Sequence, residues 1–413
     1  MVLLPSPSSA WAEKAVYKAR ITGSGQKRGM GAKQGKTRSA LKSHTFPLRT
    51  NSPMERINTL HQWLQTQLGS NPSLSAPIGD ASSRRYFRLL LADGTSRIAM
   101  DAPPERNDLR SFTQIATLLK PVLRVPSILA QDLTQGFLLL DDLGDIDLQT
   151  ALAALQTPPH PSRSQREQED NDRQVFTQAE GLYRWVIQDL IALQKSTPTD
   201  SLPVYSAEIM VDDLNRFAEW YADKHLGKPL QGDDLAVWER SRALLVARAQ
   251  AQGKVPVHFD FHCRNLIVGH SQGPQMGLAE RVGIIDFQDA RLGPITYDLA
   301  SLLKDMYVHW PESLRLELAI RFWESARLAA LPVSPAFDAF YAEFEIMGVF
   351  RQIRTLGTFA RLAHRDGKAQ YIADMPIALD YLRETCARYT ELHPLYKLIN
   401  KLTDYQVSVG YTF

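Results

Sequence analysis

The stretch that decides the fold of this chain is HFDFHCRN at 258–265, which carries the spacing His258-x-Asp260-x-x-x-x-Asn265. An apolar run at 266–268 follows directly, and a second apolar run at 283–285 leads into Asp286. Both runs are typical of short strands bounded by turns. They place three oxygen donors, Asp260, Asn265 and Asp286, at strand ends that we expect to lie close together.

The three donors suit phosphoryl transfer. This reaction needs a carboxylate to orient and deprotonate the acceptor hydroxyl, and hard oxygen ligands to hold Mg²⁺ on the nucleotide phosphates. The spacing predicts Asp260 as the base, Asn265 and Asp286 as metal ligands, and His258 as a support for the loop. Two other interpretations stay open. The donors could simply cap strands as turn residues, or His258, His262 and Asp260 could bind zinc, although the glutamate of H-E-x-x-H is missing.

The composition is that of an ordinary globular protein, with 47 Lys and Arg against 45 Asp and Glu in 413 residues. At roughly 150 residues per domain, this length predicts two or three domains. The two cysteines, Cys263 and Cys386, form no metal-ligand spacing, which favours a reducing compartment, and we expect a cytoplasmic protein. No apolar run approaches the roughly 18 residues that cross a bilayer, so we expect no membrane partner.

Three segments differ in character. Residues 1–51 are expected to be a disordered leader, since residues 1–50 hold ten Lys or Arg against one acid and little apolar surface to bury. Residues 52–142 are rich in strand patterns and begin with a capping box at Ser52. Residues 143–413 are mainly helical and include a polar tract at 157–174 that we expect to be a mobile insertion. The sequence therefore predicts an α+β fold, with a small β-rich N-terminal lobe, a larger helical C-terminal lobe and a cleft between them.

The basic leader leaves two interpretations open. It could be an arm that binds nucleic acid or acidic lipid, or a dispensable stretch ahead of a start at Met54. We expect no nucleic-acid partner, because no aromatic residues are interleaved with the basic run.

Several long stretches resemble one family. They are GDASSRRYFRL at 79–89, IAMDAPPE at 98–105, VPSILAQDLTQGFLLLDDLG at 125–144, HFDFHCRNL at 258–266, IIDFQDARLGPITYDLASLL at 284–303 and LGTFARLAHRDGKAQY at 356–371. Over residues 55–395 the chain resembles the aminoglycoside phosphotransferase family of protein-kinase-like folds. Within that family it is most similar to bacterial kinases that phosphorylate N-acetylmuramate and N-acetylglucosamine at C1 in cell-wall recycling.

The resemblance implies ATP and Mg²⁺ as cofactors. It implies that Asp260 is the catalytic base and that Asn265 and Asp286 bind Mg²⁺. Asp298 would have a structural role, anchoring the backbone of the catalytic loop.

The resemblance also implies where the nucleotide lies. Residues 137–142 would form a hinge between the lobes, and its backbone N–H and C=O groups would pair with the adenine edge, those of Leu140 and Asp142 in particular. The loop from Gly79 to Tyr86 would cover the phosphates, with Ser82 and Ser83 supplying hydroxyl or backbone donors.

One departure concerns the lysine that kinases of this fold carry on the strand V-A-I-K. Here the strand reads IAMD at 98–101, and the helix expected at 108–120 has no glutamate to pair with a lysine. Another cation must meet the phosphate charge, and the nearest are Arg84, Arg85 and Arg88. Strand alternation puts Arg84 and Arg88 on one face and Arg85 on the other. We expect Arg85 or Arg88 to contact the nucleotide.

The charge of the binding site limits which acceptor the enzyme can use. An aminoglycoside is polycationic and needs an acidic pocket, whereas N-acetylmuramate carries a carboxylate and needs a cation. A helix expected after residue 335 presents four arginines on a face about 80° wide, namely Arg351, Arg354, Arg361 and Arg365. Either some of them meet the acceptor, Arg354 and Arg361 being candidates beside His262 and Arg264 of the catalytic loop, or they form a solvated basic face.

The spacing of the oxygen donors predicts a kinase, and the resemblance implies that it transfers the γ-phosphoryl group of ATP to the anomeric hydroxyl of an N-acetylated amino sugar. A sugar-1-phosphate uridylyltransferase would act on the product. The alternatives are a phosphotransferase for an aminoglycoside or another small hydroxylated molecule, and a nucleotide-binding module without catalysis.

Overall fold

The computed structural model of the chain describes residues 53–78, 84–155, 165–271 and 277–406. The N-terminal lobe, here residues 53–141, contains α1 (Pro53–Leu68), β1 (Ser73–Leu74), β2 (Arg85–Leu90), β3 (Ser96–Asp101), α2 (Leu109–Leu119), β4 (Ile128–Asp132) and β5 (Phe137–Asp141). No helix within the described ranges is long and apolar enough to cross a membrane.

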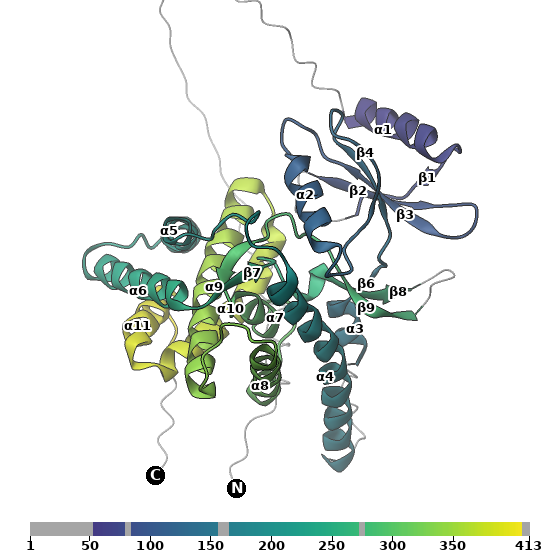
Figure 1. Cartoon of the computed structure of the whole chain (residues 1–413). Coiled ribbons are helices and arrows are strands. Elements are labelled where there is room, and N and C mark those ends of the chain that lie inside the picture. Colours follow the sequence, from purple (N-terminus) through teal and green to yellow (C-terminus); the bar gives the residue numbers. More distant parts are fainter. Residues whose placement is uncertain (1–52, 79–83, 156–164, 272–276, 407–413) are drawn as a thin grey trace, which may run out of the picture. The chain divides into compact units, whose positions relative to one another are not determined.

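The rest of the chain, from residue 142, is the C-terminal lobe and is mainly helical (Figure 1). Its strands are β6 (Ile146–Asp147), β7 (Lys254–Val257), β8 (Leu266–His270), β9 (Gly277–Ile284) and β10 (Arg291–Pro294). Its helices are α3 (Leu148–Leu155), α4 (Gln165–Ser196), α5 (Ala207–Arg216), the π-helix η3 (Phe217–His225), α6 (Gly232–Ala251), η4 (Cys263–Asn265), α7 (Tyr297–Leu303), α8 (Glu312–Leu328), α9 (Phe337–Asp366), η5 (Ala369–Asp374), α10 (Met375–Arg388), η6 (Thr390–Leu392) and α11 (His393–Leu402).

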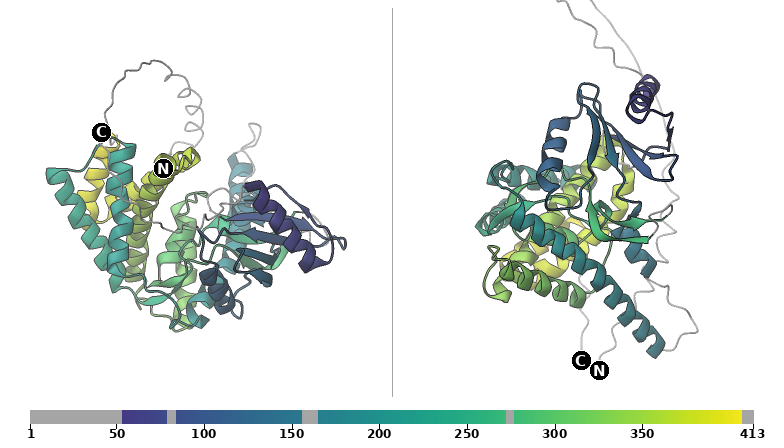
Figure 2. Two further views of the ribbon diagram at one scale, coloured as in Figure 1. Left: turned by 90° about the horizontal axis from the view of Figure 1, so that it is seen from above. Right: turned by 45° about the vertical axis from the view of Figure 1, so that its right-hand side comes forward.

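The N-terminal lobe is built on an antiparallel five-stranded sheet in the order β1-β2-β3-β5-β4. Side chains alternate between its two faces. Phe87 and Leu139 belong to a small core that the outer face forms with α1, through residues such as Leu64. Met100 and Leu140, on the inner face, join the large core shared with α2 and the C-terminal lobe. Helices α1 and α2 therefore lie on opposite faces of the sheet (Figures 1 and 2).

Helix α9 is the centre of the C-terminal lobe and is buried along most of its length. It packs against η3, α5, α6, α7 and α10. A Cβ on Gly357 would lie 2.5 Å from the backbone carbon of Arg216, so the close approach of α9 to the α5–η3 junction requires glycine there. An ion pair between Lys304 and Glu345, with N and O 3.1 Å apart and both side chains 1% exposed, links α9 to the end of α7.

Two small sheets of the C-terminal lobe hold the loops of interest. Strand β7 pairs with β10, and β8 pairs with both β9 and β6. The segment 258–265 joins β7 to β8, and Asp286 follows the end of β9. The two predicted strand ends are therefore neighbours, because Leu266 of β8 lies opposite Ile284 of β9.

The structure confirms the predicted α+β organisation and corrects several boundaries. Helix α4 begins at Gln165, so the tract at 157–174, predicted as a mobile insertion, is helical from 165 onward; residues 156–164 lie outside the described ranges. The tract lacks apolar residues, but Gln, Glu and Arg propagate a helix at little cost once the following turns are anchored. Helix α5 is continued from Phe217 by the π-helix η3, and α7 ends at Leu303.

Candidate active site

The catalytic loop, residues 258–265, is held by Asp298 at the start of α7. Asp298 is fully buried, and its two carboxylate oxygens accept hydrogen bonds from the backbone N–H groups of His258 (2.6 Å) and Phe259 (3.0 Å). This is the anchoring role predicted for Asp298. Burial raises the pKa of Asp298 to about 7, against the lowering effect of the two amides.

His258 is a structural residue of the loop. Its Nδ1 accepts a hydrogen bond from the N–H of Asp260 at 3.3 Å, and its Nε2 lies 3.0 Å from the carbonyl oxygen of Ile285. Burial lowers the pKa of His258 to about 4, so the ring is neutral and Nε2 is the protonated nitrogen that donates to Ile285. With both ring nitrogens in use, His258 is not placed to bind zinc, and the structure does not favour that interpretation.

Phe259 has a left-handed backbone conformation, with φ at 83°. Such a conformation is costly for a bulky residue and persists only where the surroundings fix it. The ring of Phe259 stacks on that of Tyr297, with centroids 5.0 Å apart, and the guanidinium groups of Arg291 and Arg354 lie 3.8 and 4.3 Å from its centroid. Arg351 also donates to the Phe259 carbonyl oxygen at 3.3 Å. The loop is thereby fixed on both sides immediately before Asp260.

Asp260 and Asn265 are joined within the loop. The Nδ2 of Asn265 donates to the backbone carbonyl oxygen of Asp260 at 2.9 Å, and lies 3.3 Å from Nε2 of His262. Since the amide nitrogen is used inside the loop, the orientation of Asn265 leaves its Oδ1 as the donor atom for a ligand. The backbone carbonyl of Asn265 accepts a hydrogen bond from Ile285 at 3.1 Å, which ties this end of the loop to the strand that precedes Asp286.

Asp286 also has a left-handed conformation, with φ at 62°. Nε2 of Gln288 donates to its Oδ1 at 2.9 Å. Burial, and then the negative charge of Asp260, raise the pKa of the Asp286 carboxyl. Two carboxylates near each other, one of them destabilised by burial, form a site at which a cation would lower the electrostatic energy.

Asp260 differs from Asp286 in its charged neighbours. Burial opposes its ionisation, but Arg354, His262 and Arg351 outweigh burial and lower its pKa, so Asp260 is ionised at neutral pH. The Nη1 of Arg354 lies 3.8 Å from Oδ1 of Asp260. Arg354 is itself held by Asp213 of α5, with its Nε 3.1 Å from Oδ2 of that residue. Tyr205 donates its hydroxyl proton to the same oxygen at 2.7 Å.

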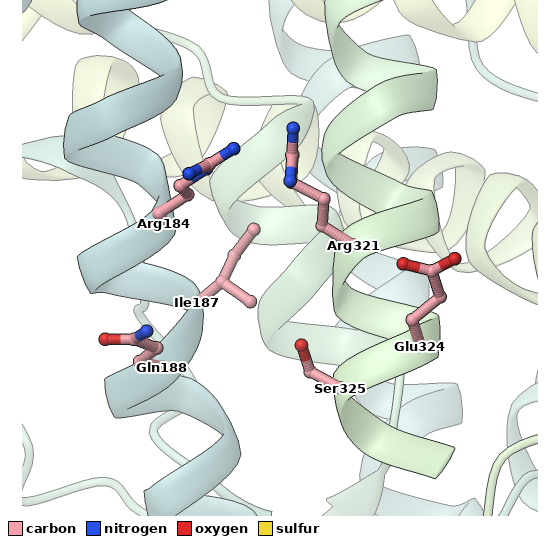
Figure 3. Close-up of a pocket in the computed structure, with 6 residues that line it drawn as sticks. All are labelled: Arg184, Ile187, Gln188, Arg321, Glu324 and Ser325. Carbon is pink, nitrogen blue, oxygen red and sulfur yellow. The ribbon is translucent and has the colours of Figure 1, made fainter. Parts of the chain in front are cut away.

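A cavity of about 540 Å³ opens beside these residues, between the two lobes. It is lined from the N-terminal lobe by residues that include Arg84, Tyr86, Arg88, Ile98, Phe112 and Leu140, and from the C-terminal lobe by residues that include Asp142, His262, Arg264, Asn265, Asp286, Tyr307 and Tyr371. A smaller hollow of about 250 Å³ lies between α4 and α8, with Arg184 and Arg321 facing each other across it (Figure 3). None of the predicted site residues lines the smaller hollow.

Some of the residues predicted to bind the nucleotide line the cavity. Arg88, Leu140 and Asp142 line the cavity, whereas Ser82 and Ser83 lie outside the described residues. Leu140 lies inside β5, opposite Ile98 of β3 and Ile128 of β4, so it reaches the cavity with its side chain rather than with free backbone groups.

The structure corrects the prediction for Arg85. This residue is not among those that line the cavity, because its side chain lies on the opposite face of the sheet and is paired with the buried carboxylate of Asp101. Arg56 of α1 pairs with the same carboxylate, with Nε 2.6 Å from Oδ1. Strand alternation had separated Arg85 from Arg84 and Arg88 correctly, but it could not tell which face meets the cavity.

The residues predicted to meet the acceptor occupy two places. His262 and Arg264 line the cavity, where the Arg264 guanidinium lies 4.9 Å from the centroid of the Tyr307 ring. Arg354 lies beside Asp260, and Arg361 follows two turns further along α9, half-buried. Burial, followed by the positive charges of Arg216 and Arg365, lowers the pKa of Arg361.

The arginine face of α9 therefore has a graded environment rather than one role. Arg351 is buried against the catalytic loop, and Arg365 is exposed and paired with Asp366.

The aromatic residues Tyr307 and Tyr371 were not predicted as part of the site. Tyr371 ends the stretch at 356–371 quoted above, but its sequence gave no sign that it reaches the cavity.

Comparison with known proteins decides the family. A model described as the phosphotransferase enzyme family matches residues 73–331. The chain belongs to this family. It is a phosphotransferase with an alcohol group as acceptor, that is, a kinase that uses a nucleotide, and the resemblance found in the sequence is confirmed.

Two curated relatives cover most of the chain. A protein of Neisseria meningitidis serogroup B named N-acetylmuramate/N-acetylglucosamine kinase is 39% identical over 362 residues, which are 87% of this chain and 100% of the relative. A protein of Pseudomonas aeruginosa with the same name is 40% identical over 325 residues, 78% of this chain and 86% of the relative.

Solved structures confirm the fold. Choline kinase LicA from Streptococcus pneumoniae is similar with a TM-score of 0.52 at 13% identity, over 82% of this chain and 100% of that one. An ethanolamine kinase from Plasmodium vivax is similar with a TM-score of 0.54 at 10% identity, over 83% and 91%. The bilobal, protein-kinase-like α+β fold predicted from the sequence is thus the fold of this kinase.

Proposed function

We propose that this kinase transfers the γ-phosphoryl group of ATP to the anomeric hydroxyl of N-acetylmuramate and N-acetylglucosamine. The observation that carries the proposal is the identity of about 40% to relatives of that name, over most of the chain and of each relative. A sugar 1-phosphate is the product, and it is the form that a uridylyltransferase accepts. We therefore assign the enzyme to the reuse of cell-wall amino sugars.

Asp260 is the proposed catalytic base. Its carboxylate is ionised at neutral pH, and the loop that carries it is fixed by Asp298 on one side and by Asn265 on the other. Asp260 would accept a hydrogen bond from the anomeric hydroxyl, orient its oxygen toward the phosphorus and take its proton as the new bond forms. Because the loop is fixed before substrate arrives, little ordering is left for the bound state.

Asn265 and Asp286 are the proposed ligands of Mg²⁺. A carboxylate and an amide oxygen are hard donors of the kind this ion prefers, and the orientation of the Asn265 amide leaves its oxygen available. The raised pKa of the Asp286 carboxyl marks a site that a cation would stabilise. When bound, Mg²⁺ would neutralise charge on the nucleotide phosphates.

ATP is proposed to lie in the cavity of about 540 Å³, against Leu140 and the hinge at Asp142. Asp142 accepts hydrogen bonds from Arg88 (2.5 and 3.0 Å), from the Ser96 hydroxyl (2.7 Å) and from the N–H of Gly144 (3.0 Å). Its side chain is therefore committed to the hinge. Backbone groups at Asp142 remain the proposed contacts of the adenine edge, with Ser82 and Ser83 proposed for the phosphates.

The acceptor is proposed to enter from the side of His262 and Arg264. Arg354 and Arg361 would then lie near the sugar, where the lactyl carboxylate of N-acetylmuramate needs a cation. A cluster of arginines is unfavourable for a polycationic aminoglycoside. This argues against an antibiotic as the natural acceptor.

Phosphorus NMR of purified enzyme with Mg·ATP tests the proposal, with N-acetylmuramate, N-acetylglucosamine and kanamycin offered in parallel. We expect a sugar 1-phosphate signal with the two amino sugars and none with kanamycin. Asp260→Asn should abolish the signal, whereas Asp380→Asn, at a side chain 70% exposed on α10, should leave it unchanged. Phosphorylation of kanamycin alone, or turnover of Asp260→Asn within a few-fold of the parent, would refute the substrate or the mechanism respectively.

A further inference from the structure

The described lining of the nucleotide cavity contains no lysine. In kinases of this fold, a lysine on the equivalent of β3 binds the nucleotide phosphates. Here β3 supplies Ile98 to the cavity, while its neighbour on the same face, Met100, is fully buried. Among the described lining residues, arginine side chains carry the fixed positive charge, those of Arg84, Arg88 and Arg264.

Arg88 is already neutralised. It forms a bidentate pair with Asp142, with distances of 2.5 and 3.0 Å, and donates to the carbonyl oxygen of Gly144 at 2.9 Å. The two hydrogen bonds to Asp142 and the third to Gly144 hold the guanidinium group in place. Moving Arg88 to a phosphate would leave the Asp142 carboxylate, whose side chain is 2% exposed, without its cation, which is unfavourable.

Arg264 lies on the C-terminal-lobe side of the cavity, at the end from which the acceptor is proposed to enter. It precedes Asn265 in the catalytic loop and lies over the ring of Tyr307. His262 packs against the same ring, with centroids 5.4 Å apart. This end is the one at which the acceptor is proposed to bind.

Arg84 lies where the triphosphate is expected. It directly precedes β2, lines the cavity together with Asp286, and its guanidinium lies 6.0 Å from the centroid of the Phe112 ring. Phe112 in turn packs on Phe287, with centroids 4.9 Å apart, and Phe287 is the residue after Asp286. Arg84 and Asp286 thus line the same cavity, and the rings of Phe112 and Phe287 connect the two residues.

We propose that Arg84 replaces the strand lysine and binds the phosphates of the nucleotide next to Asp286. The planar guanidinium offers two parallel N–H donors to a phosphate, where a lysine offers a point charge. The cation therefore comes from the residue before β2, in place of a residue on β3. The inference rests on the proposed function for the nucleotide, and it does not depend on which sugar is the acceptor.

The test compares two ligands that differ only in their phosphates. Binding of ADP and of adenosine, each with Mg²⁺, is measured by calorimetry for the parent, Arg84→Met, Arg84→Lys and Arg110→Met. Arg110 is an exposed arginine on α2, outside the cavity lining, and is the matched control. We expect Arg84→Met to weaken ADP binding roughly 10- to 100-fold and to leave adenosine binding unchanged. Arg84→Lys should recover part of the loss, and Arg110→Met should match the parent.

The outcomes are distinct. ADP affinity of Arg84→Met equal to that of the parent would overturn the role of Arg84 and leave the kinase function standing. An equal loss for ADP and adenosine would also overturn it, since it would show a general effect on the cavity. If the parent bound neither ligand, the proposed nucleotide site itself would be wrong.

Discussion

Replacing Asp298 by alanine should destabilise the protein more than any change at an exposed carboxylate. Asp298 is fully buried and accepts the backbone N–H groups of His258 and Phe259, at 2.6 and 3.0 Å. Alanine leaves both amides without that acceptor. A buried donor that loses its partner costs about 1–3 kcal/mol, so the pair predicts a loss of roughly 2–6 kcal/mol in the free energy of unfolding. The strained conformation of Phe259 loses part of its support as well.

Urea unfolding at pH 7, followed by circular dichroism, measures the effect. The matched control is Asp93→Ala, because Asp93 also accepts two hydrogen bonds, from N–H and Oγ1 of Thr95, but in an exposed turn. Water can replace both bonds there, so the control should lose far less stability. Equal losses in the two variants, or a loss below about 1 kcal/mol for Asp298→Ala, would refute the argument that burial makes these bonds costly to remove.

Three further predictions concern charge. His258 should contribute a loss of roughly 3 kcal/mol of stability as the pH falls from 6.5 to 4, because the pKa of this buried histidine is about 4 in the folded state against 6.5 for an ordinary histidine. Protonation of Asp298, whose pKa is about 7 in the folded state, acts in the opposite direction over the same range. The contribution of His258 is therefore measured by urea unfolding as the difference in stability between the parent and His258→Gln, which should change by roughly 3 kcal/mol in favour of the variant between pH 6.5 and 4. Arg354→Met should raise the pKa of Asp260 and so move the acid limb of the pH profile of kcat/KM to higher pH. An acid limb at the same pH as in the parent would show that Arg354 does not stabilise the ionised Asp260. Arg361→Met should raise KM for N-acetylmuramate about tenfold or more and leave KM for N-acetylglucosamine unchanged, measured by steady-state kinetics with both sugars. Equal changes in the two KM values would exclude a contact of Arg361 with the lactyl carboxylate.

The local features of the site could be predicted from the sequence. The loop at 258–265 and Asp286 depend on residues close in the chain and on one short strand pair, so their spacing was enough to bring them together. The strand-rich character of residues 52–142 was also predicted, from alternating and apolar runs, and this segment holds β2, β3 and β5. The two-residue strand β1, and strands β4 and β10, carry too little periodicity to stand out.

Contacts between distant parts of the chain could not be predicted. Asp213 holds Arg354 across 141 positions of sequence, and nothing in either segment indicates the other. The roles of Arg84 and Arg85 depend on which face of β2 meets the cavity. That face is decided by α1, which covers the other one and pairs Arg56 with Asp101.

The separate core beneath α1 has a consequence for how the protein opens. The inner face of the sheet shares one continuous core with the C-terminal lobe, whereas the outer face is joined to α1 by a small set of side chains, including Leu60, Leu64 and Phe87. Local opening follows the boundaries between such cores. Amide hydrogens of α1 should therefore exchange with solvent well before those of β5, and the cavity side of the sheet should keep its protection while the outer layer detaches. Nucleotide binding should slow exchange on the cavity side and leave the exchange of α1 unchanged.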